Sequence, residues 1–285
     1  MIMFKMNMKT ITALFVISLA VSGVANDWIG CYMQTKELTK TYKDGRSAPS
    51  GIKAVTYIQF EKNNRLNHFC KYLNENGMNW KSSGVWFNEG TNLYYSIEYG
   101  EQLHIGKLVG SPNKQGIETL NDIDGRLALS SSSTVERIPS YEFPLRLSDD
   151  EVIPRLKQLK DVVKNMPRET SSGAATKELF YDAVQSAVTN RDFSVLMRLS
   201  YFPEGEYGER IRERRYFLYA SNLLSKKPEA KQYDDGQQHV QMILKKEEFP
   251  KGSSEIDVLI MNSTLFPYGK VGDAWYFLQT KKKTK

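Results

Sequence analysis

Turn-forming residues recur at a nearly constant interval in the first half of the 285-residue chain, and this interval limits the fold more than any other feature. The turns centre on positions that lie 11 to 13 residues apart: Asn63, Asn76, Glu89, Gly100, Pro112 and Asp124. The runs between them are rich in β-branched and aromatic residues and alternate in part between apolar and polar. This pattern is typical of strands in an antiparallel meander.

Counting a first run that begins at Trp28, the segment predicts eight strands, at about 28–41, 53–61, 65–73, 78–87, 92–99, 102–109, 116–121 and 126–137. Eight up-and-down strands can close into a barrel, whose interior is filled by side chains or by one small ligand. The sequence therefore predicts an all-β domain over residues 26–138, an eight-stranded antiparallel up-and-down barrel.

Alternation along two strands predicts which side chains face the barrel interior. These inward positions are Ile29, Cys31 and Met33 on the first strand and Leu93, Tyr95, Ile97 and Tyr99 on the fifth. His104 alternates with Leu103 and Ile105, so we expect it to face solvent outside the barrel.

Aromatic residues gather in the middle strands, and four of them are the candidate ligand-binding residues: Trp80, Trp86, Tyr95 and Tyr99. Such rings can line a cavity for a small apolar molecule. The open alternative is that they only fill the barrel, since a small barrel needs bulky side chains to pack its interior.

Two stretches give this segment a resemblance to a known family. The opening WIGCY, residues 28–32, resembles the start of a lipocalin-like barrel, although Tyr32 stands where that family usually has Trp. The close, IETLNDIDGRLALSSSSTVERI, resembles the last hairpin of small lipocalin-like domains. The resemblance spans residues 27–138 and implies a barrel that houses a pocket.

Beyond Ile138 the pattern changes from strands to helices. Residues 139–173 read as a linker that contains one connecting helix, with apolar residues at helical spacing from Val152 to Val163. Three further helices are expected at 176–190, 191–200 and 208–225, followed by three strands at 237–249, 255–266 and 273–280. Helices followed by an antiparallel sheet predict an α+β domain over 174–280, before a basic tail at 281–285.

The C-terminal order of elements resembles the ketosteroid-isomerase-like cone of the nuclear-transport-factor superfamily. The run GDAWYF, residues 272–277, is similar to the Gly-acid-x-Trp-Tyr-Phe run of its final strand. If the expected strands face the same way, His239 and Asp257 project into one cone and could act as an acid/base pair. The alternative is that both are ordinary polar positions of a sheet.

No established catalytic or phosphate-binding motif occurs in the sequence, and no histidine or cysteine has metal-ligand spacing. We therefore expect no metal and no cofactor, and catalysis stays the secondary hypothesis. The run ERIRERRYF alternates charges of both signs, which favours a solvated helix face over a polyanion site, so no nucleic-acid partner is expected.

The N-terminus has the layout of a secretory signal peptide over residues 1–25: two lysines and no acid before an apolar run, then Gly23 and Ala25 at the positions of a cleavage site. We expect cleavage after Ala25 and a periplasmic or secreted protein without a membrane span. Removing Lys5 and Lys9 lowers the formal charge from +6 to +4. The alternative is a lipoprotein anchored at Cys31.

An exported chain with two cysteines favours pairing, so the sequence predicts a disulfide between Cys31 and Cys70. Two buried thiols are the alternative. Taken together, these features predict an exported soluble binding or envelope accessory protein that takes a small apolar ligand in the barrel or the cone. An enzyme of isomerase or hydrolase type using the cone is the alternative, and neither ligand identity nor oligomeric state follows from the sequence.

Overall fold

A computed structural model describes residues 28–41, 47–73, 79–110, 116–117, 121–122, 127, 135–166, 171–203, 206–245, 247–262 and 264–282. The predicted signal peptide and most of the basic tail lie outside these residues, as do parts of the last two strands predicted for the barrel. Within the described part, no helix is long and apolar enough to span a bilayer.

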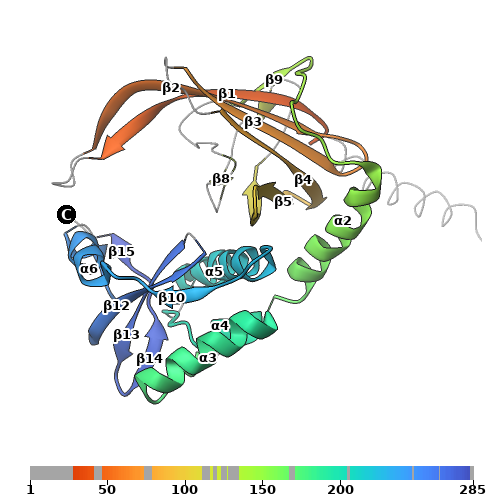
Figure 1. The fold of residues 1–285 in the computed structure, drawn as a ribbon. Helices are drawn as coiled ribbons and strands as arrows, with labels where there is room; N and C mark the ends of the chain where they lie inside the picture. Colours follow the sequence, from red (N-terminus) through yellow and green to blue (C-terminus); the bar gives the residue numbers. More distant parts are fainter. Residues whose placement is uncertain are drawn as a thin grey trace, which may run out of the picture.

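The first half forms one large antiparallel sheet, drawn as an arch in Figure 1. Its strands are β1 Gly30–Thr41, β2 Ser47–Phe60, β3 Arg65–Leu73, β4 Asn79–Glu89, β5 Asn92–Tyr99, β6 Gln102–Val109, β7 Gly116–Ile117, β8 Asn121–Asp122 and β9 Val135–Ile138. They follow the order β7-β9-β1-β2-β3-β4-β5-β6-β8. The predicted meander is confirmed from β1 to β6, whereas the described strands do not show a closed eight-stranded ring.

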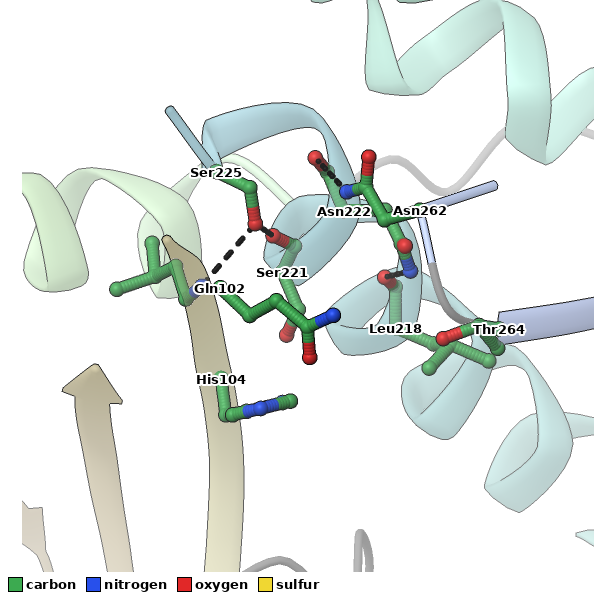
Figure 2. A pocket seen from close by; sticks show the side chains of 9 residues that line it. Gln102, His104, Leu218, Ser221, Asn222, Ser225, Asn262 and Thr264 are labelled. Atoms are coloured by element: carbon green, nitrogen blue, oxygen red, sulfur yellow. Dashed lines mark hydrogen bonds between the residues drawn. The ribbon is translucent and has the colours of Figure 1, made fainter. Parts of the chain in front are cut away.

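A helix pairs with the first part of β6, whose last two residues, Leu108 and Val109, pair with β8. Ser221 and Ser225 lie one turn apart on α5 (Glu206–Leu224 and the residue after it). They accept hydrogen bonds from the backbone N–H groups of Ile105 and Leu103 at 2.8 and 3.0 Å, and Figure 2 shows the bond of Ser225. Four residues of helix rise about 6 Å, which matches two residues of strand at about 6.6 Å. In a closed barrel, the N–H groups of Leu103 and Ile105 would donate to a neighbouring strand. Here they donate to two serine side chains of the helix instead.

The second half combines helices with a four-stranded sheet (Figure 1). The helices are α2 Asp149–Lys164, α3 Lys177–Asn190, α4 Phe193–Arg198, α5 Glu206–Leu224 and α6 Gly236–Leu244. The sheet has the order β10-β12-β13-β14, from Ala230–Gln232, Ser253–Met261, Thr264–Val271 and Ala274–Phe277. A separate pair joins β11 Glu247–Glu248 to β15 Lys281–Lys282. The α+β character of this half is confirmed.

Two secondary-structure elements predicted for the second half of the chain are wrong. The expected strand at 237–249 is largely helix α6, because Gly236 and Val240 are buried one turn apart and Asp235 precedes the helix as its N-cap. The expected single strand at 255–266 is a tight hairpin of β12 and β13. Met261 pairs with Thr264 and Asn262 adopts a φ of 51°, the left-handed conformation that such hairpin turns require.

One apolar core contains side chains from both halves of the chain. Val85, Phe87, Tyr94, Leu103 and Ile105 of the large sheet belong to the same buried cluster as the helices and the small sheet. The helix α2 joins this cluster and begins with a capping box between Ser148 and Glu151. The predicted domain boundaries stay a prediction, but this packing makes the two halves neighbours.

The register of the large sheet corrects the faces predicted for β1. Cys31 pairs with Gln59, which pairs with Asn67, whereas Cys70 pairs with Thr56. Since paired residues share a face and neighbours alternate, Cys31 and Cys70 lie on opposite faces of the sheet. Both are buried free thiols, so the predicted disulfide is wrong.

The face that carries Cys31 is called the outer face here, and the face that carries Tyr32, Ile58, Leu66 and Tyr95 is the inner face. The prediction that Ile29, Cys31 and Met33 point inward is wrong. The outer face of β2 and β3 is apolar because the connector after β9 covers it: Tyr141 stacks on Tyr57 and Phe69 with ring centroids 3.9 and 5.8 Å apart. The inward prediction for β5 is confirmed, with Leu93, Tyr95 and Ile97 fully buried.

Candidate functional site

The inner face of the large sheet divides into an apolar end and a polar, aromatic end. Phe60, Leu66, Trp86, Tyr95 and Leu108 are among the side chains that pack the apolar end. Toward the other end, two successive cross-strand rows turn polar: His68 pairs with Ser82, and Gln34, Thr56, Cys70 and Trp80 follow across β1 to β4. The polar end is therefore a distinct part of the inner face.

His68 lies at the boundary between these ends and is fully bonded. Its Nε2 lies 3.2 Å from the carbonyl oxygen of Leu127, which can only accept, so this nitrogen carries the proton. Its Nδ1 accepts from the Tyr99 hydroxyl at 2.8 Å, with the Ser82 hydroxyl at 3.1 Å. Burial, helped by the charge of Lys36 and opposed by the hydrogen bond to Leu127, lowers the pKa of His68 to about 4. The imidazole is thus neutral at pH 7 and holds the Tyr99 phenol in place.

Four side chains continue from Tyr99 across neighbouring strands, and we name them the aromatic band: Tyr72, Trp80, Tyr99 and His104. Each contacts the next edge-to-face, with ring centroids 6.4, 6.1 and 5.3 Å apart. Trp80 is 46% exposed, and the other three are partly buried. The band is a connected, partly solvent-exposed aromatic surface in which each ring contacts the next.

The four predicted ligand-binding residues fall into two groups. Trp80 and Tyr99 belong to the aromatic band. Trp86 and Tyr95 are buried in the apolar core, where the Trp86 indole donates to the carbonyl of Glu61 at 3.1 Å. The Tyr95 hydroxyl lies where a side chain on Gly106 would be, with its oxygen 2.4 Å from the position of a Cβ atom there. For Trp86 and Tyr95, core packing is the role that the contacts support.

The solvent-facing position predicted for His104 is wrong, because it shares the inner face with Tyr99. Sequence reasoning also missed His68 and Ser82. The signal that could have found them is a single polar residue in each alternating apolar set: His68 stands between Leu66 and Cys70 on β3, and Ser82 stands between Trp80 and Gly84 on β4. A buried row of polar side chains needs specific partners, and those partners come from other strands.

The predicted acid/base pair in the C-terminal half does not form. His239 is on α6 and contacts the Tyr233 ring edge-to-face at 6.3 Å. Asp257 is on β12, where its carboxylate accepts hydrogen bonds from the Gln232 amide at 3.0 Å and from its neighbour Val258 N–H at 2.8 Å. No contact joins His239 and Asp257 among the described residues.

Asp257 is instead the end of a short hydrogen-bonded chain of hydroxyls. The Tyr268 hydroxyl donates to its carboxylate at 3.3 Å, and the Tyr181 hydroxyl lies 2.8 Å from that of Tyr268. Burial raises the pKa of Tyr268 well above its usual range, so this phenol stays protonated. Beside this chain, Phe277 of the small sheet contacts both Phe266 of the same sheet and Phe180 of helix α3 edge-to-face. Aromatic rings thus occupy the space that the cone hypothesis assigns to a substrate.

Among the described residues, concavities lie beside α5 on both of its sides that face β6 and α2. A cavity of about 10 Å³ lies between β6 and α5, lined by Gln102, His104, Ser221 and Asn262 among others (Figure 2), and it holds one water at most. A larger open groove of about 360 Å³ runs between α2 and the α4–α5 pair, beside Lys157, Asp161 and Phe193. The described residues hold no group of three or more His, Cys, Asp or Glu that could bind a metal ion.

Comparisons of the chain with protein-family models, with characterised proteins and with solved structures give no match. Both resemblances noted in the sequence therefore stay predictions. The function must be argued from the geometry of the aromatic band and its surroundings.

Proposed function

We propose that the protein is a non-enzymatic binding protein that takes a small, ring-bearing molecule on the aromatic band. The observation that carries the proposal is the exposure of Trp80, 46%, within a connected row of rings on the inner face. A single exposed apolar residue is ordinary, but an aromatic cluster with polar neighbours is the usual composition of a ligand-contacting surface.

Hydrogen bonds beside the band restrict the Tyr99 side chain before any ligand binds, which lowers the conformational entropy lost on binding. The Tyr99 hydroxyl is held by a buried, neutral His68, and His68 is held in turn by a backbone carbonyl. Side chains that are already fixed lose little freedom when a ligand arrives, which favours affinity. The ligand would contact ring surface on Trp80 and Tyr72 and hydrogen-bond to the polar atoms beside them.

The enzyme alternative has weaker support. It was based on His239 and Asp257, which lie on different elements without contact in the described residues. The hydroxyl chain that ends at Asp257 is bounded by packed rings rather than by an open site.

Titration with N-phenyl-1-naphthylamine, an uncharged fluorescent probe with fused rings, tests the proposal. We expect saturable binding with one site. Trp80→Ala should weaken it by at least about tenfold, because central aromatic contacts contribute more than about 1.4 kcal/mol. Leu179→Ala removes another exposed apolar side chain, on α3, and is the matched control that should leave binding unchanged. Equal binding by wild type and Trp80→Ala would refute the proposal.

Export is a second component of the proposal and rests on the N-terminal sequence alone. Cleavage after Ala25 would release the binding half outside the cytoplasm, and lipidation at Cys31 is the competing route. The intact mass of the protein recovered from its source separates the two, since an acylated chain beginning at Cys31 would contradict signal cleavage after Ala25.

A further inference from the structure

The inner face of strands β1 to β6 carries a lysine, Lys36, near the aromatic band. Lys36 pairs with Ala54, which pairs with Tyr72, so all three lie in one cross-strand row on the inner face. Lys36 is partly buried, and no ion pair joins it to a described residue. Its charge also reaches the interior, because it contributes to the lowered pKa of His68.

No carboxylate balances this charge on the same face of β1 to β6. The acidic residues of these strands are Glu37, Glu89 and Glu98, and alternation places each of them on the outer face. There Glu98 forms a salt bridge with Arg155 at 3.0 Å. His68, which is buried on the inner face, is neutral at pH 7.

A second cation lies at the β9 end of this face. Arg137 pairs with Tyr32, and its guanidinium lies 5.7 Å from the Tyr32 ring centroid. Its side chain also donates to the carbonyl of Ile29. Arg137 is therefore partly engaged, whereas Lys36 is available to a ligand that rests on Tyr72 and Trp80.

From this charge distribution we infer that the ligand of the aromatic band is an anionic amphiphile, a ring-bearing body with a carboxylate, sulfonate or phosphate group that pairs with Lys36. This inference rests on the proposed function of the band. The rings would bury the apolar body, and the ammonium would select for the acidic group, because a partly desolvated cation without a partner favours an incoming anion.

Two probes that share one ring system separate charge from ring contact. The probe 8-anilinonaphthalene-1-sulfonate is the sulfonated form of N-phenyl-1-naphthylamine. Lys36→Met should weaken binding of the sulfonate about fivefold, the effect of one partly exposed ion pair, and leave the uncharged probe within twofold. Lys36→Arg should keep the affinity for the sulfonate. Lys71→Met, on the outer face of the neighbouring row, is the control for a general loss of charge.

The outcomes distinguish this inference from the proposed function. If Lys36→Met weakens the sulfonate no more than Lys71→Met does, or if only the uncharged probe binds, the anion selectivity is wrong while the band remains the binding surface. If Trp80→Ala leaves both probes unaffected, the proposed function itself fails. Loss of the Lys36 effect at high salt would agree with ion pairing, because salt screens partly exposed charges.

Discussion

At the scale of single residues, His68 shows how one buried side chain organises the candidate site. It is neutral, it is bonded at both ring nitrogens, and its partners come from three different segments of the chain. Protonation would add a buried charge and remove the acceptor that holds Tyr99. The site is therefore linked to the protonation state of a group that solvent does not reach.

This linkage predicts a loss of stability in acid. The unfolded chain takes up a proton at His68 near pH 6.5, whereas the folded protein does so only near its lowered pKa of about 4. Stability should be unaffected above pH 6.5 and should fall by up to roughly 3 kcal/mol between pH 6.5 and pH 4. Urea unfolding of wild type and His68→Gln at pH 7, 6 and 5 measures this contribution. Identical pH slopes for the two proteins would contradict it.

The cysteines give a second prediction at this scale. Both are buried, and burial raises the pKa of the Cys31 thiol to about 11, so the reactive thiolate is rare. We expect no reaction with a thiol reagent in the native protein and two equivalents after denaturation without reductant. Two equivalents absent until a reductant is added would show a disulfide and would contradict the register of β1, β2 and β3.

At the scale of elements, two side-chain hydrogen bonds attach helix α5 to strand β6 of the large sheet. Ser221→Ala or Ser225→Ala leaves a buried strand N–H group without its acceptor, which costs about 1 to 3 kcal/mol. Each variant should lower the unfolding free energy by that amount and speed amide exchange at Ile105 or Leu103. Ser186→Ala, at an exposed position on α3, is the control. An equal loss of unfolding free energy in this variant would argue against a stabilising contact between α5 and β6.

The sequence predicted elements well where a single pattern decides them and poorly where packing decides them. Strands β1 to β6 follow from turn residues and alternation. The β1 face was inverted because its outer residues, covered by the connector at Tyr141, are apolar, whereas inner positions such as Gln34 and Lys36 are polar. Helix α6 was missed because its apolar residues satisfy both a period of two and a helical spacing.

Of the four residues predicted to bind a ligand, two belong to the aromatic band, because packing rather than a local pattern decides which rings lie together. Trp80 and Tyr99 follow from composition, but their separation from Trp86 and Tyr95 depends on which cross-strand row each occupies. His68 and Lys36 became visible only when the register placed them beside the rings. The side of β6 that faces away from β5 meets helix α5 at Leu103 and Ile105 and strand β8 at Leu108 and Val109, and no local pattern in the sequence encodes that division.

At the scale of the whole molecule, the shared core predicts a single cooperative unfolding transition. Val85, Phe87 and Tyr94 of the large sheet are buried in the same cluster as the helices, so separating the halves would expose them. Scanning calorimetry should show one transition, and the isolated fragment 26–138 should expose this apolar surface and bind a hydrophobic dye nonspecifically. Two resolved transitions would indicate independently folding domains.

The central claim is that ligands contact the aromatic band, and the four tryptophans allow a direct test. Trp28, Trp86 and Trp275 are at most 5% exposed, whereas Trp80 is 46% exposed. In protein labelled with 5-fluorotryptophan, the Trp80 resonance is assigned from its absence in Trp80→Phe and followed by fluorine NMR during titration with N-phenyl-1-naphthylamine. We expect the Trp80 resonance to shift in step with binding while the resonances of the other three tryptophans stay in place. Saturation by the probe with an unmoved Trp80 resonance would place the binding surface elsewhere and contradict the claim.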